Sequence, residues 1–275
     1  MTLERLGFET LFSYRSGGIL TVEALESILF LAPSLQTDDF LMNKEILRMI
    51  QSSIGRKWIV AVTGVLMIGF VVVHMTGNLQ MFAGTPDKIN GYAHLLKSYP
   101  LVLWSFRLGL LATAALHIWG TISLARENRI AKPVGYAVAG RKSRLQVTLT
   151  SVTMVISGII LLGFIIFHLL HFTAQVVDRS YASMETVVGG VTMPDVYRMV
   201  VTGFSKPWIS LFYVVAMALL FSHLRHGAAS VWQTFGLRDR NSAQFIEMGS
   251  WILATVLFLG FSSIPVAVLL GVLKL

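Results

Sequence analysis

Five long apolar stretches limit what this chain of 275 residues can fold into. They cover residues 58–82, 101–125, 147–177, 208–235 and 245–273, and each is long enough to cross a bilayer, which takes about 20 apolar residues. The stretches are continuously apolar, whereas the strands of a membrane β-barrel alternate polar and apolar residues. We therefore expect an all-α membrane protein with five transmembrane helices.

The composition agrees with this fold class and excludes several kinds of chemistry. Hydrophobic residues make up 55% of the chain, charged residues only 13%, and the mean hydropathy is +0.70, unlike an ordinary soluble domain. The chain has no cysteine, which excludes disulfides, iron–sulfur clusters, thiolate zinc sites and covalent haem attachment. Because carboxylates are nearly absent from the apolar stretches, a metal centre inside them has to use histidine nitrogens.

Lysine and arginine gather on alternate sides of the predicted spans. Twelve lie on the side of the first span's start: Lys44, Arg48, Arg56, Lys57, Arg126, Arg129, Lys132, Arg141, Lys142, Arg144, Arg238 and Arg240. Six lie on the other side, diluted by acids: Lys88, Lys97, Arg179, Arg198, Lys206 and Lys274. The positive-inside rule then predicts a cytoplasmic N-terminus and an outside C-terminus. The basic side either only sets the topology and contacts anionic lipid, or also docks a soluble partner.

Residues 1–41 differ from the rest of the chain. They contain six acidic residues and no long apolar run, and Met42 opens a more ordinary beginning. We expect residues 1–41 to be a poorly ordered N-terminal extension or an artefact of an upstream start codon. Residues 42–275 are then the five-helix membrane domain.

Each of the first four apolar stretches contains one central histidine: His74, His117, His168 and His223. An imidazole inside a membrane is costly unless it has a partner. Because neighbouring spans run in opposite directions, His74 and His168 form a pair near the outer side, and His117 and His223 form an inner pair. Two histidines on different helices can take both axial positions of one haem. We expect two stacked, non-covalent b haems inside a bundle of the first four helices, with the fifth helix peripheral.

Other interpretations of these histidines remain open. They could form interhelical hydrogen bonds, or serve as proton relays, although relays usually include acidic partners. His171 and His226 follow His168 and His223 by three residues, so they share helix faces with them and are rival ligands. His171, His226 and Arg225 are also candidates for binding haem propionates. His94, in the first outer loop, is an interfacial residue or a quinone contact.

Several local motifs resemble one known family. They are QSSIGRKW before the first span, HMTGN from His74, NGYAHLLKSYP in the first outer loop, HIWG in the second span, a ten-residue step from glycine to His74 and again to His168, and WQTFG ending at Gly236, thirteen residues after His223. From about Met42 onward the chain resembles the dihaem cytochrome b membrane subunit of succinate:quinone oxidoreductases. This is the five-helix class of bacterial succinate dehydrogenases and fumarate reductases.

The resemblance implies a set of ligands and partners. It favours His168 over His171 and His223 over His226, and it pairs His74 with His168 and His117 with His223. It implies a flavoprotein subunit with FAD and the dicarboxylate site, and an iron–sulfur subunit, both docked on the cytoplasmic face of a bacterial inner membrane. Electrons would pass between the iron–sulfur subunit and a membrane quinone, with menaquinone favoured. No dicarboxylate active site and no nucleic-acid partner are expected for this chain.

The position of the quinone stays open in the sequence. Candidates on the outer side are Asn78, Tyr92 and His94, and candidates on the inner side are Ser52, Ser53 and Arg56. Phe221 stands where some family members carry a buried glutamate. Alternative functions are a cytochrome b anchor of another respiratory dehydrogenase, such as a formate dehydrogenase or a hydrogenase, and a haem-free transporter or structural anchor.

Overall fold

A computed structural model describes residues 44, 48, 50–131 and 141–275, and the side chains of 141–152 are not described. The predictions for residues 1–41 therefore lie outside the described residues. The chain divides into two units, Met1–Ser52 and Ser53–Leu275. The second unit contains the helices and the candidate site discussed below.

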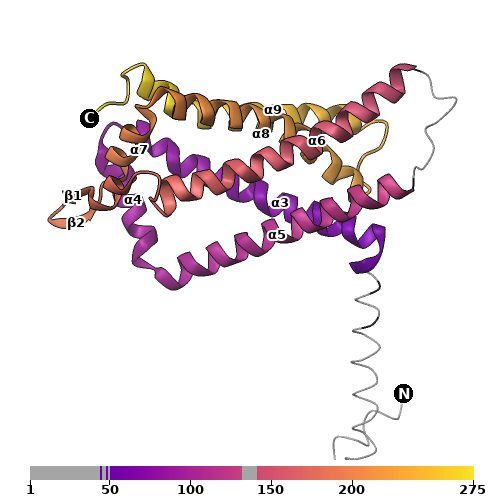
Figure 1. The fold of residues 1–275 in the computed structure, drawn as a ribbon, viewed down its shortest axis with the longest axis horizontal. Helices are drawn as coiled ribbons and strands as arrows, with labels where there is room; N and C mark the ends of the chain where they lie inside the picture. The colour runs from indigo at the N-terminus through magenta and orange to yellow at the C-terminus, as the bar shows by residue number, and fades with distance from the viewer. Residues whose placement is uncertain (1–43, 45–47, 49, 132–140) are drawn as a thin grey trace, which may run out of the picture. The chain divides into compact units, whose positions relative to one another are not determined.

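Five helices are long and apolar enough to cross a membrane, which confirms the five predicted spans and makes this a mostly helical, multi-pass membrane protein. They are α3 (Ser53–Asn78), α5 (Pro100–Ile130), α6 (Arg141–His168), α8 (Pro207–Thr234) and α9 (Ala243–Leu269), shown in Figure 1. Pro100 and Pro207 stand at the first turn of α5 and α8, where the missing N–H costs no hydrogen bond.

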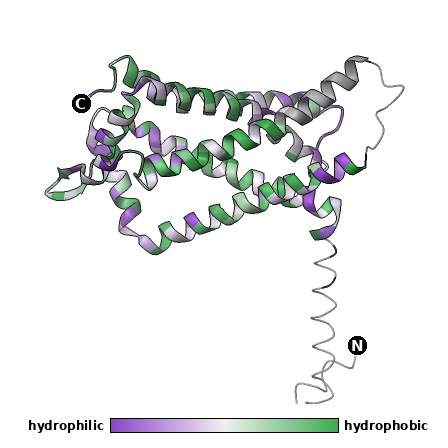
Figure 2. Cartoon of the chain, viewed as in Figure 1, coloured by the Kyte–Doolittle hydropathy of each residue, from purple (hydrophilic) through white to green (hydrophobic). Residues whose placement is uncertain are grey.

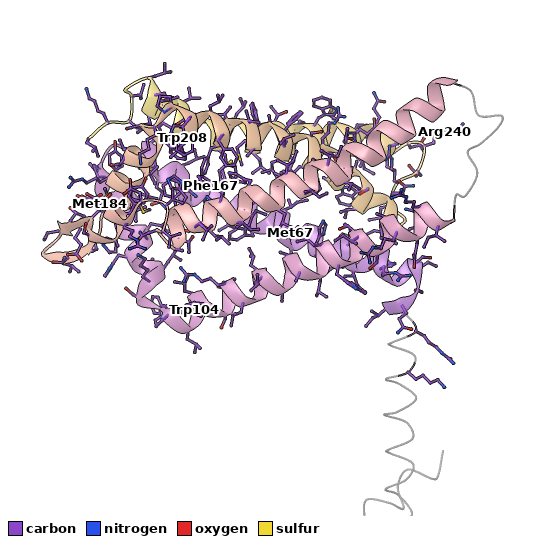
Figure 3. The ribbon with its side chains drawn as sticks, in the orientation of Figure 1. Met67, Trp104, Phe167, Met184, Trp208 and Arg240 are labelled. Carbon is purple, nitrogen blue, oxygen red and sulfur yellow. The ribbon has the colours of Figure 1, made fainter. Side chains whose placement is uncertain are left out.

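Apolar residues dominate the middle of the five helices, and polar residues gather toward their ends (Figure 2). Four of the six exposed tryptophans follow this division. Trp104 and Trp208 lie near the start of α5 and α8 at one end (Figure 3), and Trp58 and Trp232 lie toward the opposite ends of α3 and α8. Such amphipathic rings are enriched where a membrane meets water.

Short elements connect the spans at one end of the bundle, which we call the hairpin end. Between α3 and α5 lie η1 (Leu79–Phe82) and α4 (Pro86–Ser98). Between α6 and α8 lie η2 (Leu169–Thr173), η3 (Arg179–Ser183), β1 (Glu185–Val188), β2 (Val191–Pro194) and α7 (Val196–Phe204). The strands form an antiparallel hairpin, and its turn uses Gly189 and Gly190, both with positive φ.

Helix α9 packs along α8 and also contacts α3, and its buried residues include Ala254, Leu257 and Ile264. A Cβ on its Gly260 would overlap Sδ of Met75, so the glycine lets α3 approach closely. By contrast, α5 buries only Gly120. Helix α9 therefore covers the α3 and α8 side of the bundle, and its peripheral place relative to the haems stays a prediction.

Candidate metal centre

The four histidines lie on two levels of the bundle. A Cβ on Gly64 would lie 3.5 Å from Cε1 of His117, and a Cβ on Gly158 would lie 3.7 Å from Cε1 of His223. Ten residues further along the same two helices stand His74 and His168, which is about 15 Å of helix rise. We call His117 and His223 the inner tier. We call His74 and His168, nearer the hairpin end, the outer tier.

The outer-tier rings face each other closely. The ring centroids of His74 and His168 lie 5.8 Å apart, and their planes form an angle of 82°. Two imidazoles on opposite sides of one metal ion place their centroids about 6 Å apart, because each metal–nitrogen bond is about 2 Å. The distance between these rings therefore suits two axial ligands of a shared metal.

Aromatic and polar neighbours hold the outer-tier rings. Phe70 stacks on His74 at 5.3 Å and Phe164 stacks on His168 at 5.9 Å between centroids. The Asn78 amide donates to the His74 carbonyl at 2.7 Å and lies 3.3 Å from Nε2 of the His74 ring. A metal bound at Nε2 of His74 would displace only the longer contact, the one between the Asn78 amide and that nitrogen.

Hydroxyl groups on neighbouring helices contact the inner-tier rings. Oγ1 of Thr63 lies 3.1 Å from Nδ1 of His117, and Oγ of Ser157 lies 3.1 Å from Nδ1 of His223. Within the described part of the chain, Nε2 of His223 has no hydrogen-bond partner, and the His117 ring also bonds to the Val60 backbone. His117 and His223 also lie within electrostatic range of each other. The inner tier thus offers two Nε2 atoms on two different helices.

The donor set fits a haem better than it fits a bare metal ion. Among the described residues, no group of three or more histidine, cysteine, aspartate or glutamate side chains could hold a metal. Structural zinc needs four protein ligands, and calcium needs six or more oxygens. A haem brings four nitrogens of its own and takes one or two axial ligands from the protein. Two imidazoles in each tier match this need.

Two further helix glycines do not belong to the tiers. Gly69 and Gly163 each stand five residues before a tier histidine, and a Cβ added at either would meet nothing within 4 Å. Because an α-helix turns by about 100° per residue, both lie on a different face of their helix from the histidine that follows.

The structure gives His171 partners other than a metal or a propionate. The ring is fully buried, with Nδ1 at 3.0 Å from the Tyr213 hydroxyl and Nε2 at 3.3 Å from the Tyr181 hydroxyl. It stands in the π-helical turn η2, where Ala174 N–H bonds to the Leu169 carbonyl five residues back. The same Tyr213 hydroxyl lies 3.3 Å from Nδ1 of His168, so one phenol contacts both rings.

Arg225 and His226 contact each other on α8. Nη2 of Arg225 lies 2.8 Å from Nε2 of His226, and the guanidinium lies over the Trp251 ring at 4.5 Å. Among the described residues no carboxylate pairs with Arg225. A guanidinium has five N–H donors, so this one keeps donors for an anionic group.

The hairpin end contains a cavity of about 190 Å³ that sequence reasoning missed. Its lining includes Lys97, Arg107, Gln175 and Tyr181. Burial raises the pKa of Tyr181 to about 12, so its hydroxyl stays protonated and can donate a hydrogen bond at neutral pH. None of the predicted quinone contacts lines this cavity.

The predicted outer quinone contacts lie elsewhere at the hairpin end. Tyr92 on α4 packs against Gly77, beside Asn78 at the end of α3. His94 is half-buried on α4, where its carbonyl accepts from Ser98. The structure therefore brings Tyr92 close to Asn78, and it places His94 outside the cavity lining.

The predicted inner quinone contacts are divided between the two units. Arg56 near the start of α3 forms an ion pair with Glu127 near the end of α5. Ser53 is exposed at the first position of α3, and Ser52 closes the other unit. Arg56 therefore already has a carboxylate partner that joins two helices.

Sequence reasoning missed Thr63, Ser157, Tyr213 and Tyr181. The first two had a signal, because a hydroxyl residue directly precedes both Gly64 and Gly158, eleven residues before a histidine in each case. The two tyrosines had none, since their contacts depend on how α6, η3 and α8 pack.

The fold and these contacts define a multi-pass membrane protein with two tiers of paired histidines. No protein-family model, no curated protein and no solved structure matches the chain.

Proposed function

We propose that the chain is the membrane-anchor cytochrome b subunit of a succinate dehydrogenase or fumarate reductase. In this role it passes electrons between an iron–sulfur subunit and a membrane quinone through two non-covalent b haems. The observation that carries the proposal is the outer tier, whose ring centroids lie 5.8 Å apart on two separate helices. The inner tier, with its two Nε2 atoms, supports a second centre of the same kind.

The residues of the chain supply binding, orientation and spacing. When bound, haem iron would alternate between its ferric and ferrous states and so carry one electron at a time. His74 and His168 would hold one group, and His117 and His223 the other. Along α3 and α6 the tiers are about 15 Å apart, so the two centres would lie in series across the membrane.

Charged groups near the tiers suit the other parts of the cofactor and the quinone. Arg225 keeps donors for a propionate, with His226 beside it. We place the quinone headgroup in the hairpin-end cavity, where Tyr181, Lys97 and Arg107 could bond to its oxygens. Hydrogen bonds link Tyr181 through His171 and Tyr213 to His168. Menaquinone is the favoured quinone, from the family resemblance.

The partner subunits would dock at the end where α3 begins. Arg126, Arg129 and Arg240 are exposed there, and Figure 3 shows Arg240 at the opposite end from Met184. In this proposal that end faces the cytoplasm of a bacterium, and the C-terminus lies outside. The flavoprotein would carry FAD, and the iron–sulfur subunit would feed the inner tier.

One alternative shares the same histidine geometry. Paired axial histidines also suit the cytochrome b anchor of another respiratory dehydrogenase, because the tiers hold haem regardless of the partner. A transporter is less well supported, since no acidic side chain hydrogen-bonds to any of the four histidines in the described part of the chain.

A reduced-minus-oxidised spectrum of the purified chain and its variants tests the proposal. We expect b-type absorption and two haems per chain. His74→Ala and His168→Ala should lose the same centre, and His117→Ala and His223→Ala the other. His94→Ala, a control outside both tiers, should keep two haems. Absence of b-type absorption from the wild type, or loss of one common centre in His74→Ala and His117→Ala, would contradict it.

A further inference from the structure

Two buried hydroxyl groups contact the inner-tier rings in the same way. Thr63 on α3 faces His117 on α5, and Ser157 on α6 faces His223 on α8. We propose that Thr63 and Ser157 are positioning residues that hold these rings with a proton on Nδ1 and a free lone pair on Nε2. This inference rests on the proposed function, because it concerns how the inner tier is prepared for a haem.

Counting protons on Thr63 gives the direction of the first hydrogen bond. Oγ1 of Thr63 donates to the Ile59 carbonyl at 2.6 Å, with the Val60 carbonyl at 3.2 Å. A hydroxyl has a single proton; we assign it to the Ile59 carbonyl, the shortest of its contacts, so that the oxygen accepts from Nδ1 of His117. His117 therefore carries its proton on Nδ1, and Nε2 keeps its lone pair.

Ser157 repeats the arrangement on the other helix pair. Its Oγ lies 3.1 Å from the Met154 carbonyl and 3.1 Å from Nδ1 of His223, and the same assignment gives its proton to the carbonyl and makes the oxygen the acceptor of Nδ1–H. Ligating histidines usually donate their second ring N–H to such an acceptor, which fixes the tautomer and the ring orientation. Two separate helix pairs thus use the same device.

Burial separates these two residues from ordinary helical hydroxyls. Thr63 and Ser157 are each only 5% exposed. Thr76, by contrast, is exposed on the same helix and makes the same kind of backbone bonds, to the carbonyls of Val72 and Val73. A hydrogen bond from a hydroxyl to its own helix therefore does not explain why Thr63 and Ser157 are buried against imidazole rings.

The adjacent glycines complete the contact. Gly64 follows Thr63 and lies against His117, and Gly158 follows Ser157 and lies against His223. A Cβ at either would just reach van der Waals contact with the ring, at 3.5 Å and 3.7 Å. The glycine lets the ring lie against the helix, while the preceding hydroxyl accepts the hydrogen bond from the ring's Nδ1–H.

The hydrogen bond should tune the bound group. Donation from Nδ1–H makes Nε2 a more basic ligand. A more basic axial ligand stabilises the ferric form and lowers the midpoint potential, since axial ligation and its hydrogen bonds set the potential of a haem. In the outer tier, Nδ1 of His168 contacts the Tyr213 hydroxyl of α8 instead, so substitutions of Thr63 and Ser157 should act on the inner tier.

The first test uses Thr63→Val and Ser157→Ala in the full chain with its partner subunits. Matched controls are Thr76→Val and Ser263→Ala, whose hydroxyls also donate to carbonyls in their own helices. A redox titration followed by visible and paramagnetic resonance spectra reports each centre. We expect the potential of the inner centre to rise in both variants, with the outer centre unchanged, and Thr63→Ser and Ser157→Thr to restore it.

The second test needs no haem and no substitution. Nitrogen-15 NMR of labelled histidine in the haem-free chain should show protons on Nδ1 of His117 and His223. Protons on Nε2, or unchanged potentials in haem-loaded Thr63→Val and Ser157→Ala, would overturn this inference and leave the proposed function standing. A wild-type chain that never binds b haem would instead overturn the proposed function, while the NMR result would still judge the tautomers.

Discussion

His168 and His171 lie three residues apart and differ in the side chains that they contact. His168 and His171 both contact the Tyr213 hydroxyl, as expected for residues on a shared helix face. Tyr181 then bonds to the second nitrogen of His171, whereas His168 faces His74. Their partners, more than their positions in the sequence, favour His168 as the ligand in the proposed function.

Asp178 gives the hairpin end a pH-dependent contact. Its carboxylate accepts from the Ser180 hydroxyl at 2.6 Å and from Nζ of Lys206 at 3.0 Å. These bonds, the serine first, lower its pKa to about 2, against about 3.9 in an unfolded chain. Because the folded value is the lower one, the contact stabilises the fold above about pH 4 and is lost as the pH falls toward 2.

Thermal unfolding of the detergent-solubilised chain between pH 2 and 6 should show this loss. The unfolding temperature of the wild type should fall as the pH drops through that window. Asp178→Asn should be less stable at pH 6 and depend less on pH, while Glu185→Gln, an exposed control on β1, should follow the wild type. Parallel profiles for wild type and Asp178→Asn would refute the assignment.

The contact between α3 and α5 depends on one glycine. A Cβ on Gly120 would lie 2.7 Å from Cγ2 of Val60, too close for the two helices to keep their spacing. His117 stands one turn earlier on α5, so a shift there would move its ring relative to Thr63. Overpacking of this kind costs about 1–3 kcal/mol.

Gly120→Ala should therefore lower the unfolding temperature and weaken retention of the inner haem. Gly109→Ala on the same helix is the matched control, because a Cβ there meets nothing within 4 Å. Adding Val60→Ala should rescue Gly120→Ala by removing the opposing methyl group. If Gly120→Ala behaves like Gly109→Ala, the close approach of the two helices is not needed for the site.

Hydropathy was enough to predict the five spans, because each must be apolar over its whole length to cross a membrane. It could not predict the β1–β2 hairpin or the close contact of α9 with α3. Those depend on short loop segments and on small residues such as Gly260 that meet a partner distant in sequence. The alternating directions of the spans pointed to two tiers. The cavity at Tyr181 had no local signal, since its lining comes from several separate elements.

The chain as a whole repeats one arrangement twice. Helix α3 carries an outer-tier histidine and holds the inner-tier ring of α5, and α6 does the same for α8. The result is two tiers of histidines in series between a hairpin end with a cavity and an end with exposed arginines. This order suits electron transfer from a soluble partner on one side to a quinone on the other.

A redox titration of the membrane-bound complex with succinate and a quinone analogue tests this account most directly. We expect two b-type centres, both reduced by succinate through the partner subunits and reoxidised by the quinone analogue, or the reverse sequence with fumarate as the final acceptor. Intact membranes containing the complex that show no b-type centre, or centres that neither succinate nor fumarate affects, would contradict it.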